Sequence, residues 1–317
     1  MRFEIVTIFP GFFASIFEHG IVRRALAEGL VEVGIHDLRD FTHDRHRTVD
    51  DRPFGGGEGM VLKPGPLAEA LTSLGVEAKT AREPGPADGK QEESASGFPE
   101  EHPSGAKAHV DSDALDASAK ALAYQSQPGS AAAPRVILLS AQGRPFTQAV
   151  ARELAELDRV VLLCGRYEGV DERINQLYCD MELSIGDYVL SGGELAAAVV
   201  VDAAMRLLPG VLGNEASGEF ESFGVADAEI EADTEGVPRS QHGAGGLLDY
   251  PHYTRPAEFG GLRVPETLLN GDHGQIRRWR REQQLRKTLA NRPDLLEKAA
   301  LSPEDRKLLE AMRKECD

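Results

Sequence analysis

The sequence contains few cysteines, no long apolar segment and no recognisable export signal. Its three cysteines form no CxxC pair, which favours a reduced chain without structural zinc. No apolar run approaches the ~20 residues that cross a bilayer. Glu4 interrupts the apolar N-terminus and no small-residue cleavage site follows, so a secretory signal peptide is not expected. These absences predict a cytoplasmic protein with no membrane partner.

Positive charge is scarce as well, since the 317-residue chain has a net charge of −17. Such acidity argues against a generic nucleic-acid-binding protein. The acidity is concentrated in two segments rich in Gly, Ala, Ser and acidic residues: residues 82–133 carry a net charge of −5, and residues 224–246 one of −4. A segment of this composition buries too little apolar surface to offset its ordering entropy. We interpret 82–133 as a mobile acidic insertion and 224–245 as a second insertion.

Two nucleotide-binding motifs are also absent. No G-x-G-x-x-G follows a strand and no G-x-x-x-x-G-K-[ST] occurs, so neither a dinucleotide-binding fold nor a P-loop is supported. Apolar runs do alternate with helical patterns, which is typical of a mostly parallel α/β sheet. The predicted strands are Phe3–Phe9, Val31–Leu38, Arg135–Ser140, Val160–Leu163 and Tyr188–Leu190, and the predicted helices are Ile21–Glu28, Pro64–Leu74, one capped by Thr147 and one from Ser191 to Leu208.

The stretch from Cys164 to Leu208 is the most informative part of the chain. Two predicted strands end there in glycine-bearing loops, and the capping-box spacing of Ser191 and Glu194 predicts that a helix starts at Ser191. Glycine lets a ligand approach the main chain, and loops at the carboxyl ends of parallel strands form ligand crevices. Two ordinary strand-to-helix turns would give the same pattern, so the spacing leaves both interpretations open.

Polar side chains cluster in the first of these loops. Tyr167 and Glu168 directly follow the predicted strand. An aromatic ring at this place can stack on a base, and a carboxylate can accept hydrogen bonds from a ligand. Asp171 to Arg173 fit the start of a helix with surface ion pairs.

A second polar loop, His43 to Arg52, mixes histidine, aspartate and arginine. Its histidines, His43 and His46, lack the helical spacing and the glutamate of the H-E-x-x-H zinc motif, so we expect no metal site. Donors and acceptors mixed in this way suit a polar substrate such as a nucleotide with its phosphate. A metal-dependent phosphoesterase is a more distant alternative.

Two further segments leave structural and functional interpretations open. The first, Gly213 to Phe223, carries Glu215, Glu219 and Glu221; it is either a polar linker or the source of a general base. The second, Ile276 to Lys287, holds six basic residues against a single acid. On a helix such a segment forms a solvated face or contacts phosphates.

Taken together, these stretches resemble one family, the bacterial tRNA (guanine-N1)-methyltransferases of the TrmD family in the SPOUT superfamily. The motifs that carry the resemblance are long and follow the family order. They leave out only residues 82–133 and 224–245. They are FPGFF, RDFTHDRHRTVDDRPFGGGEGMV, LSAQGR, LLCGRYEGVDER, SIGDYVLSGGELAA, RLLPGVLGNEAS, GLLDYPHYTRP and IRRWRREQQL.

The resemblance implies an α/β fold: a SPOUT-type parallel sheet with a deep trefoil knot, followed by a small C-terminal all-α domain. The expected domains are a SPOUT methyltransferase domain at 1–212, a linker at 213–250 and a helical tRNA-binding domain at 251–317. It also implies a homodimer whose active sites are shared between subunits. The implied activity is methylation of N1 of guanine 37 in tRNA.

The family's cofactor is S-adenosyl-L-methionine, and some members use Mg2+. The cofactor loops of the family fall on the following residues of this chain: Leu139, Ser140, Gly165, Tyr167, Glu168, Ile185, Gly186, Asp187, Tyr188, Val189, Leu190, Gly192 and Gly193. The residues expected to contact tRNA are His46, Asp50, Arg52, Arg277, Arg278, Arg280 and Arg281.

The catalytic residues implied by the resemblance are Arg206 and Glu221. Arg206 matches the family's catalytic arginine. Glu221 stands in an E-S-F context where the family usually has an aspartate, and Glu219 is a weaker candidate for the base. N1 of guanine carries a proton that a carboxylate must remove, and an arginine can stabilise the charge that develops on O6. The alternatives are a SPOUT methyltransferase for another RNA base and a non-catalytic RNA-binding relative.

Overall fold

The structure is a computed structural model that describes residues 1–79, 133–213, 221–224, 244–299 and 301–316. The two predicted insertions, 82–133 and 224–245, lie outside the described residues except at their ends. The chain divides into two compact units, Met1–Met205 and Arg206–Asp317. These are called the N-terminal and the C-terminal unit below, and each is described by itself.

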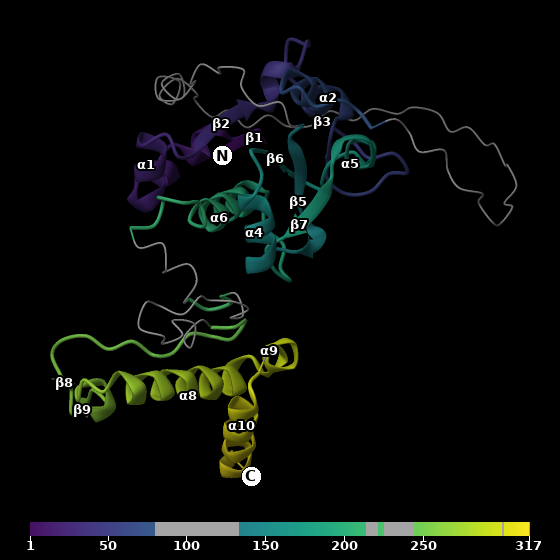
Figure 1. The fold of residues 1–317 in the computed structure, drawn as a ribbon. Coiled ribbons are helices and arrows are strands. Elements are labelled where there is room, and N and C mark those ends of the chain that lie inside the picture. Colours follow the sequence, from purple (N-terminus) through teal and green to yellow (C-terminus); the bar gives the residue numbers. More distant parts are fainter. Residues whose placement is uncertain (80–132, 214–220, 225–243, 300, 317) are drawn as a thin grey trace, which may run out of the picture. The chain divides into compact units, whose positions relative to one another are not determined.

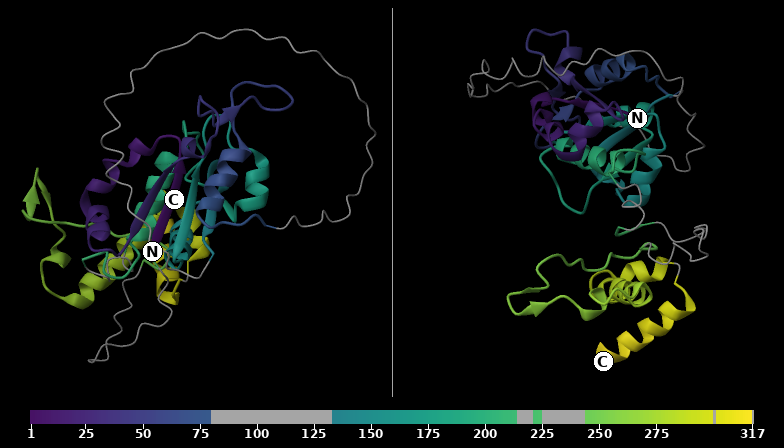
Figure 2. Two further views of the ribbon diagram at one scale, coloured as in Figure 1. Left: turned by 90° about the horizontal axis from the view of Figure 1, so that it is seen from above. Right: turned by 60° about the vertical axis from the view of Figure 1, so that its left-hand side comes forward.

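The N-terminal unit is built on a parallel sheet of five strands in the order β2-β1-β6-β5-β7 (Figure 1). The strands lie side by side when the sheet is viewed from above (Figure 2). Their bounds are β1 Arg2–Thr7, β2 Glu32–Asp37, β5 Arg135–Pro145, β6 Arg159–Cys164 and β7 Met181–Ser184. In β6 every residue after Arg159 is buried, as expected for a central parallel strand covered on both faces.

Helices cover both faces of this sheet. On one face α2 and α5 pack against Val6, Val161 and Leu163 in a single apolar cluster. Side chains alternate along a strand, so Ile5 and Leu162 point to the other face, where α4 and α6 lie (Figure 1). The helices are α1 Gly20–Ala27, α2 Pro64–Ser73, α4 Gln148–Ala155, α5 Glu172–Tyr178 and α6 Glu194–Met205; the 3-10 helices are Pro10–Phe13, Ile16–Glu18 and Leu38–Phe41; and the hairpin strands are β3 Asp50–Asp51 and β4 Val61–Leu62.

Most predicted elements of this unit are confirmed within a few residues, including Thr147 as the N-cap of α4, whose side chain accepts from the Val150 amide. Two predictions were wrong. The apolar run Tyr188–Leu190 forms no strand: Tyr188 is 55% exposed and Val189 86% exposed. The strand in this region is β7, which includes polar Glu182. The helix predicted to start at Ser191 begins at Glu194, whose side chain enters the interior instead of capping the helix.

The C-terminal unit contains three helices and a short hairpin among its described residues. The elements are α8 His273–Asn291, α9 Pro293–Lys298, α10 Pro303–Cys316, the 3-10 helix Glu266–Leu268, and the hairpin strands β8 Glu258–Phe259 and β9 Leu262–Arg263. Asp272 caps α8 by accepting from the amides of Gly274 and Gln275. Leu285 of α8 packs in a small core with Leu296 and Leu309. The expected all-α domain therefore holds a β-hairpin as well.

No helix among the described residues combines the length and the apolar character needed to span a bilayer.

Candidate functional site

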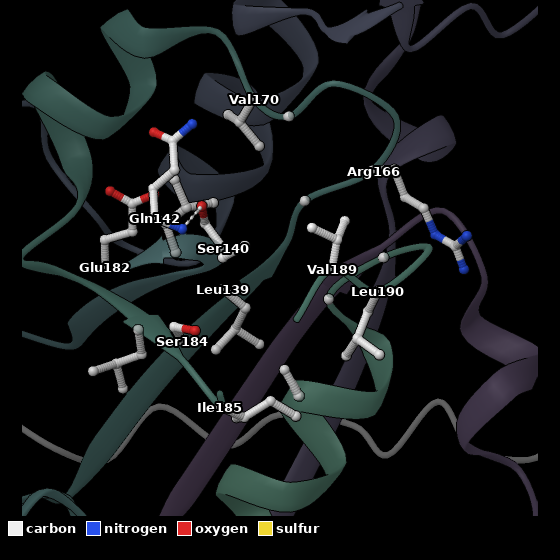
Figure 3. Close-up of a pocket in the computed structure, with 18 of the residues that line it drawn as sticks. Leu139, Ser140, Gln142, Arg166, Val170, Glu182, Ser184, Ile185, Val189 and Leu190 are labelled. Atoms are coloured by element: carbon white, nitrogen blue, oxygen red, sulfur yellow. Dashed lines mark hydrogen bonds between the residues drawn. The ribbon is translucent and has the colours of Figure 1, made fainter. Parts of the chain in front are cut away.

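A cavity of about 370 Å³ opens at the carboxyl ends of β5, β6 and β7 (Figure 3). Its walls are the end of β5, the loop 165–170 and the loop 185–193. The size falls in the range of small-molecule sites, and the position is where parallel α/β sheets bind ligands.

The predicted cofactor residues converge on this cavity with one exception. All of them line it except Asp187, which is exposed at the outside of a tight turn closed by the Tyr188 amide on the Gly186 carbonyl. The prediction missed several lining residues, namely Leu138, Ala141, Gln142, Arg166, Gly169, Val170, Glu172, Glu182, Leu183, Ser184, Ser191 and Ala196. Reading β7 at Met181–Ser184 would have placed Ser184 at a strand end beside the cavity.

The turn after β7 depends on a glycine. The Ser184 hydroxyl donates to the Gly186 carbonyl at 3.0 Å and accepts from the Gly186 amide at 3.3 Å. Gly186 has a φ of +156°, and a Cβ there would lie 2.4 Å from the Tyr188 ring. Tyr188 in turn donates its hydroxyl to the Ile185 carbonyl at 3.2 Å. The glycine therefore lets Tyr188 fold back over the turn at the cavity rim.

The loop after β6 carries backbone strain. Tyr167 has a φ of +59°, in the left-handed region where a residue with a Cβ is disfavoured by about 1–2 kcal/mol. Its neighbours are tied to the β3–β4 hairpin. The Glu168 amide donates to the Met60 carbonyl at 3.0 Å, and the Leu62 amide donates to the Gly169 carbonyl at 3.0 Å. The strained conformation is thus fixed by a neighbouring segment from the start of the chain, as is common at functional sites.

The two glycine-bearing loops of the cavity are joined to each other. The Gly193 amide donates to the Gly165 carbonyl at 2.9 Å, and Arg166 pairs with Gly192 in an isolated antiparallel bridge. Cys164 ends β6 beneath this junction. Burial, together with the negative charge of Glu194, raises the pKa of the Cys164 thiol well above its usual value. The thiol therefore stays protonated and is unsuited to act as a nucleophile.

The His43 to Arg52 loop is held by local contacts. His43 Nε2 lies 2.8 Å from Glu69 Oε2 in α2, and Asp44 accepts from the Thr48 hydroxyl at 2.8 Å. Hydrogen bonds from Thr48 lower the pKa of Asp44 below its ordinary value. His46 and Arg52 are exposed, while Asp50 in β3 is half-buried. Within the described part of the chain, no group of three or more His, Cys, Asp or Glu side chains is arranged to hold a metal ion.

In the C-terminal unit the structure brings together the two predicted catalytic residues. Arg206 Nη1 donates to Glu221 Oε1 at 2.6 Å, and both side chains are about three-quarters buried. The segment after Glu221 is anchored, since the Phe223 amide donates to the Leu247 carbonyl at 2.9 Å and Ser222 Oγ accepts from the Asp249 amide at 2.9 Å. A carboxylate and a guanidinium in contact supply one proton acceptor and one cation. Glu219, the weaker candidate, lies outside the described residues.

The four predicted tRNA-binding arginines of α8 differ in their surroundings. Arg278 is exposed and Arg277 half-buried. Arg280 lies over the Tyr250 ring, 4.9 Å from its centroid. Arg281 forms a two-pronged ion pair with Asp305 of α10, at 2.9 Å and 2.8 Å. Arg281 therefore serves helix packing, which a charge pattern on one helix could not reveal.

Comparison with known proteins gives a consistent result. The family model described as tRNA (Guanine-1)-methyltransferase TrmD matches residues 1–93 and 113–298. It thus runs through 224–245 and leaves out only 94–112 of the segment 82–133, a narrower gap than the sequence motifs indicated. Similar proteins, each named tRNA (guanine-N(1)-)-methyltransferase, come from Koribacter versatilis, Dehalococcoides mccartyi and Geobacter metallireducens. They are 49%, 43% and 40% identical over 99%, 98% and 98% of this chain and 98%, 96% and 96% of their own lengths.

Proposed function

The chain belongs to the tRNA (guanine-1)-methyltransferase family, TrmD, and from this premise we propose that it methylates N1 of guanine in tRNA, at position 37. The observation that supports this best is the cavity at the ends of β5, β6 and β7, which gathers the predicted cofactor residues apart from Asp187. Because tRNA is the proposed substrate, we also place the protein in the cytoplasm.

The cavity suits S-adenosyl-L-methionine. Apolar side chains such as Leu139, Ile185 and Leu190 line the cavity together with Ser140, Glu168 and several glycines. This mixture fits a molecule with a flat heterocycle at one end and polar ribose and amino-acid groups elsewhere. When bound, the cofactor supplies a methyl group already activated on a sulfonium.

The residues of the C-terminal unit supply the acid–base chemistry in this proposal. Glu221 accepts the N1 proton of guanine, and Arg206, which is in contact with it, stabilises the negative charge that develops on O6. Their contact at 2.6 Å supports the assignment of Glu221 as the counterpart of the family's aspartate. Residues 251–317 are proposed as the tRNA-binding domain, with Arg277 and Arg278 facing phosphates.

Two further properties of the family extend the proposal. A homodimer is supported by Leu195 and Val199, which lie one turn apart on α6 and are 49% and 45% exposed; sedimentation of the full chain tests it. The trefoil knot is proposed for the strand and loop region around the cavity on the strength of family membership. A magnesium contribution, which the resemblance allows, is measured by repeating the methylation assay with a chelator.

The test is methylation of tRNA with labelled cofactor, followed by mapping of the modified base. Glu221→Gln keeps the shape but cannot take up the proton. We expect single-turnover methylation to fall by ~10²-fold or more while cofactor affinity stays unchanged, and Glu221→Asp to remain active. Label on a different base would favour the alternative SPOUT activity. No label with any tRNA would favour a non-catalytic RNA-binding protein. Normal turnover by Glu221→Gln together with an inactive Glu219→Gln would move the base to Glu219.

A further inference from the structure

Glu194 is a buried carboxylate to which the proposed chemistry gives no role. It opens α6 directly after the Ser191-Gly192-Gly193 loop, and only 1% of its surface is exposed. A buried charge is costly unless it is paired and hydrogen-bonded. Glu194 does not line the cofactor cavity, although Gly193 before it and Ala196 in the next turn of chain do. Its hydrogen-bond partners show which parts of the chain it connects.

The partners of Glu194 come from distant parts of the chain. Thr7, at the carboxyl end of β1, donates its hydroxyl to Glu194 Oε1 at 2.7 Å, and this bond is buried. Arg166 donates Nε to Glu194 Oε2 at 3.1 Å, and its Nη2 lies 3.1 Å from the same oxygen. The carboxylate thus connects β1, the loop after β6 and the start of α6.

Arg166 extends the connection to the cavity wall. Its Nη1 donates to the Ser191 carbonyl at 2.8 Å, and its guanidinium lies 4.4 Å from the centroid of the Phe9 ring. Arg166 itself lines the cavity, and in Figure 3 its guanidinium points away from Leu139 and Ser140. Through one side chain the carboxylate therefore fixes both glycine-bearing loops.

The glycines of the second loop are explained by this network. A Cβ on Gly192 would lie 2.1 Å from Arg166 Nε and 2.5 Å from Glu194 Oε2. Only a residue without a side chain leaves room for the ion pair to pass over the loop. The residues Ser191 to Glu194 therefore do not form a capping box. Gly192 among them leaves room for the ion pair between Arg166 and Glu194.

We propose that Glu194 is a positioning residue for cofactor binding. By holding Arg166, with Thr7 as its second anchor, it keeps the loops 165–170 and 191–193 in the binding conformation. This inference rests on the proposed function in one respect, since it takes the cavity to be the cofactor site. The alternative is that the ion pair only stabilises the fold.

Glu4 offers a matched control for that alternative. It is also fully buried, lies on the same strand as Thr7, and is paired with Arg2 at 2.6 Å, His36 at 2.7 Å and Arg159 at 3.2 Å. It does not line the cavity. Glu4→Gln and Glu194→Gln remove the same charge from comparably buried ion pairs in one unit.

The experiment compares Glu194→Gln, Thr7→Val, Thr7→Ser and Glu4→Gln in the full chain. Calorimetry should find S-adenosyl-L-methionine binding at least tenfold weaker for Glu194→Gln and Thr7→Val, and unchanged for Glu4→Gln even where its melting temperature falls. Thr7→Ser keeps the hydroxyl and should bind like the unaltered chain. Equal loss of affinity in Glu4→Gln and Glu194→Gln, or none in either, would overturn the proposal.

A second measurement is independent of the cofactor. Amide exchange at Gly193, whose N–H is bonded to the Gly165 carbonyl, should accelerate in ligand-free Glu194→Gln and Thr7→Val but not in Glu4→Gln. If the unaltered chain binds no S-adenosyl-L-methionine, the proposed function fails while this exchange result still decides whether Glu194 holds the loops. Unchanged exchange in Glu194→Gln would contradict the positioning role in either case.

Discussion

Three residues other than glycine hold a left-handed backbone within the described part of the chain: Arg47, Tyr167 and Phe223. Each lies in one of the segments that the sequence marks as functional, namely the His43 to Arg52 loop, the loop after β6 and the linker that carries Glu221. Backbone strain of this kind persists where the surroundings fix it, and it clusters at functional sites. The backbone conformation of these three residues was not predicted from the sequence. It marks the same three segments as the sequence motifs.

The close packing around Gly193 can be tested by adding a single Cβ atom. A Cβ there would lie 2.7 Å from the Cys164 Cα, a backbone atom that cannot swing away. We expect Gly193→Ala to lower the free energy of unfolding by about 1–3 kcal/mol and to weaken cofactor binding, because the 191–193 loop must shift. Thermal melting and calorimetry measure the two effects.

Gly65→Ala is the control for this substitution. Gly65 lies in α2, and nothing lies within 4 Å of a Cβ built there. Alanine in a helix should leave the stability equal or raise it by up to about 1 kcal/mol. If Gly193→Ala behaves like Gly65→Ala, the close approach to Cys164 is not a constraint.

The arginines of the basic helix α8 fall into two groups, those at its surface and one that pairs with a neighbouring helix. Arg277 and Arg278 are available on its surface to different degrees, whereas Arg281 is committed to Asp305. All of these arginines were predicted to contact tRNA, because the charge pattern of a single helix carries no information about a neighbouring helix. Only the packing of α10 against α8 distinguishes them.

Alanine substitutions along α8 should separate these two roles. Arg278→Ala should weaken tRNA binding and reduce the salt dependence by about one phosphate contact, with an unchanged melting temperature. Arg281→Ala should destabilise the C-terminal unit by about 1–3 kcal/mol, since it leaves the Asp305 carboxylate without its main donor. Filter binding at several salt concentrations and thermal melting read the two effects, and a reversed pattern would contradict the assignment.

The Arg281–Asp305 pair also predicts an acid dependence. Burial acts to raise the pKa of Asp305, but the hydrogen bond and the charge of Arg281 outweigh it and hold that pKa below its ordinary value. The folded-state pKa lies below the unfolded value of about 3.9. The pair therefore stabilises the fold fully above about pH 4 and is lost as pH falls through the folded-state pKa.

Melting curves from pH 7 to pH 2 test this dependence. Asp305→Asn should melt below the unaltered chain at pH 7, and the difference should shrink as the pH falls below about 4. A difference that stays constant down to pH 2 would show that the ionised carboxylate contributes nothing.

At the scale of the whole molecule, the distribution of charge matters more for the proposed binding of tRNA than the net charge does. Residues 82–133 and 224–246 carry −5 and −4 of the net charge of −17, so the rest of the chain is less acidic than the total indicates. An acidic protein can bind tRNA when its basic residues are clustered, since only local counterion release matters.

We therefore expect tRNA affinity to fall as salt rises, despite the negative net charge. The logarithm of the association constant should decrease linearly with the logarithm of the salt concentration, by about 0.7–0.9 per phosphate contacted. Titrations between 50 and 300 mM salt are suitable. A flat dependence would mean that the basic residues of α8 and of the His43 to Arg52 loop face elsewhere.

The sequence predicted those strands that are buried on both faces, because such strands are continuous apolar runs. The strand at Val160–Leu163 is apolar because both of its faces are covered, and β6 confirms it. β7 was missed because an edge strand that includes Glu182 has no continuous apolar run. Tyr188–Leu190 was mistaken for a strand because it is apolar, although Tyr188 and Val189 lie exposed beside the cavity. The bond between Thr7 and Glu194 joins residues 187 apart in sequence, so no local pattern could reveal it.

The contact between the β3–β4 hairpin and the loop after β6 couples the binding of one ligand to the binding of the other. Three backbone hydrogen bonds join Met60 and Leu62 to the segment Glu168–Asp171. A cofactor that restrains this segment also restrains the hairpin that carries Asp50, so a tRNA contacting the hairpin loses less conformational entropy on binding. By thermodynamic reciprocity tRNA must then tighten cofactor binding by the same factor. The two ligands are therefore expected to bind with positive cooperativity.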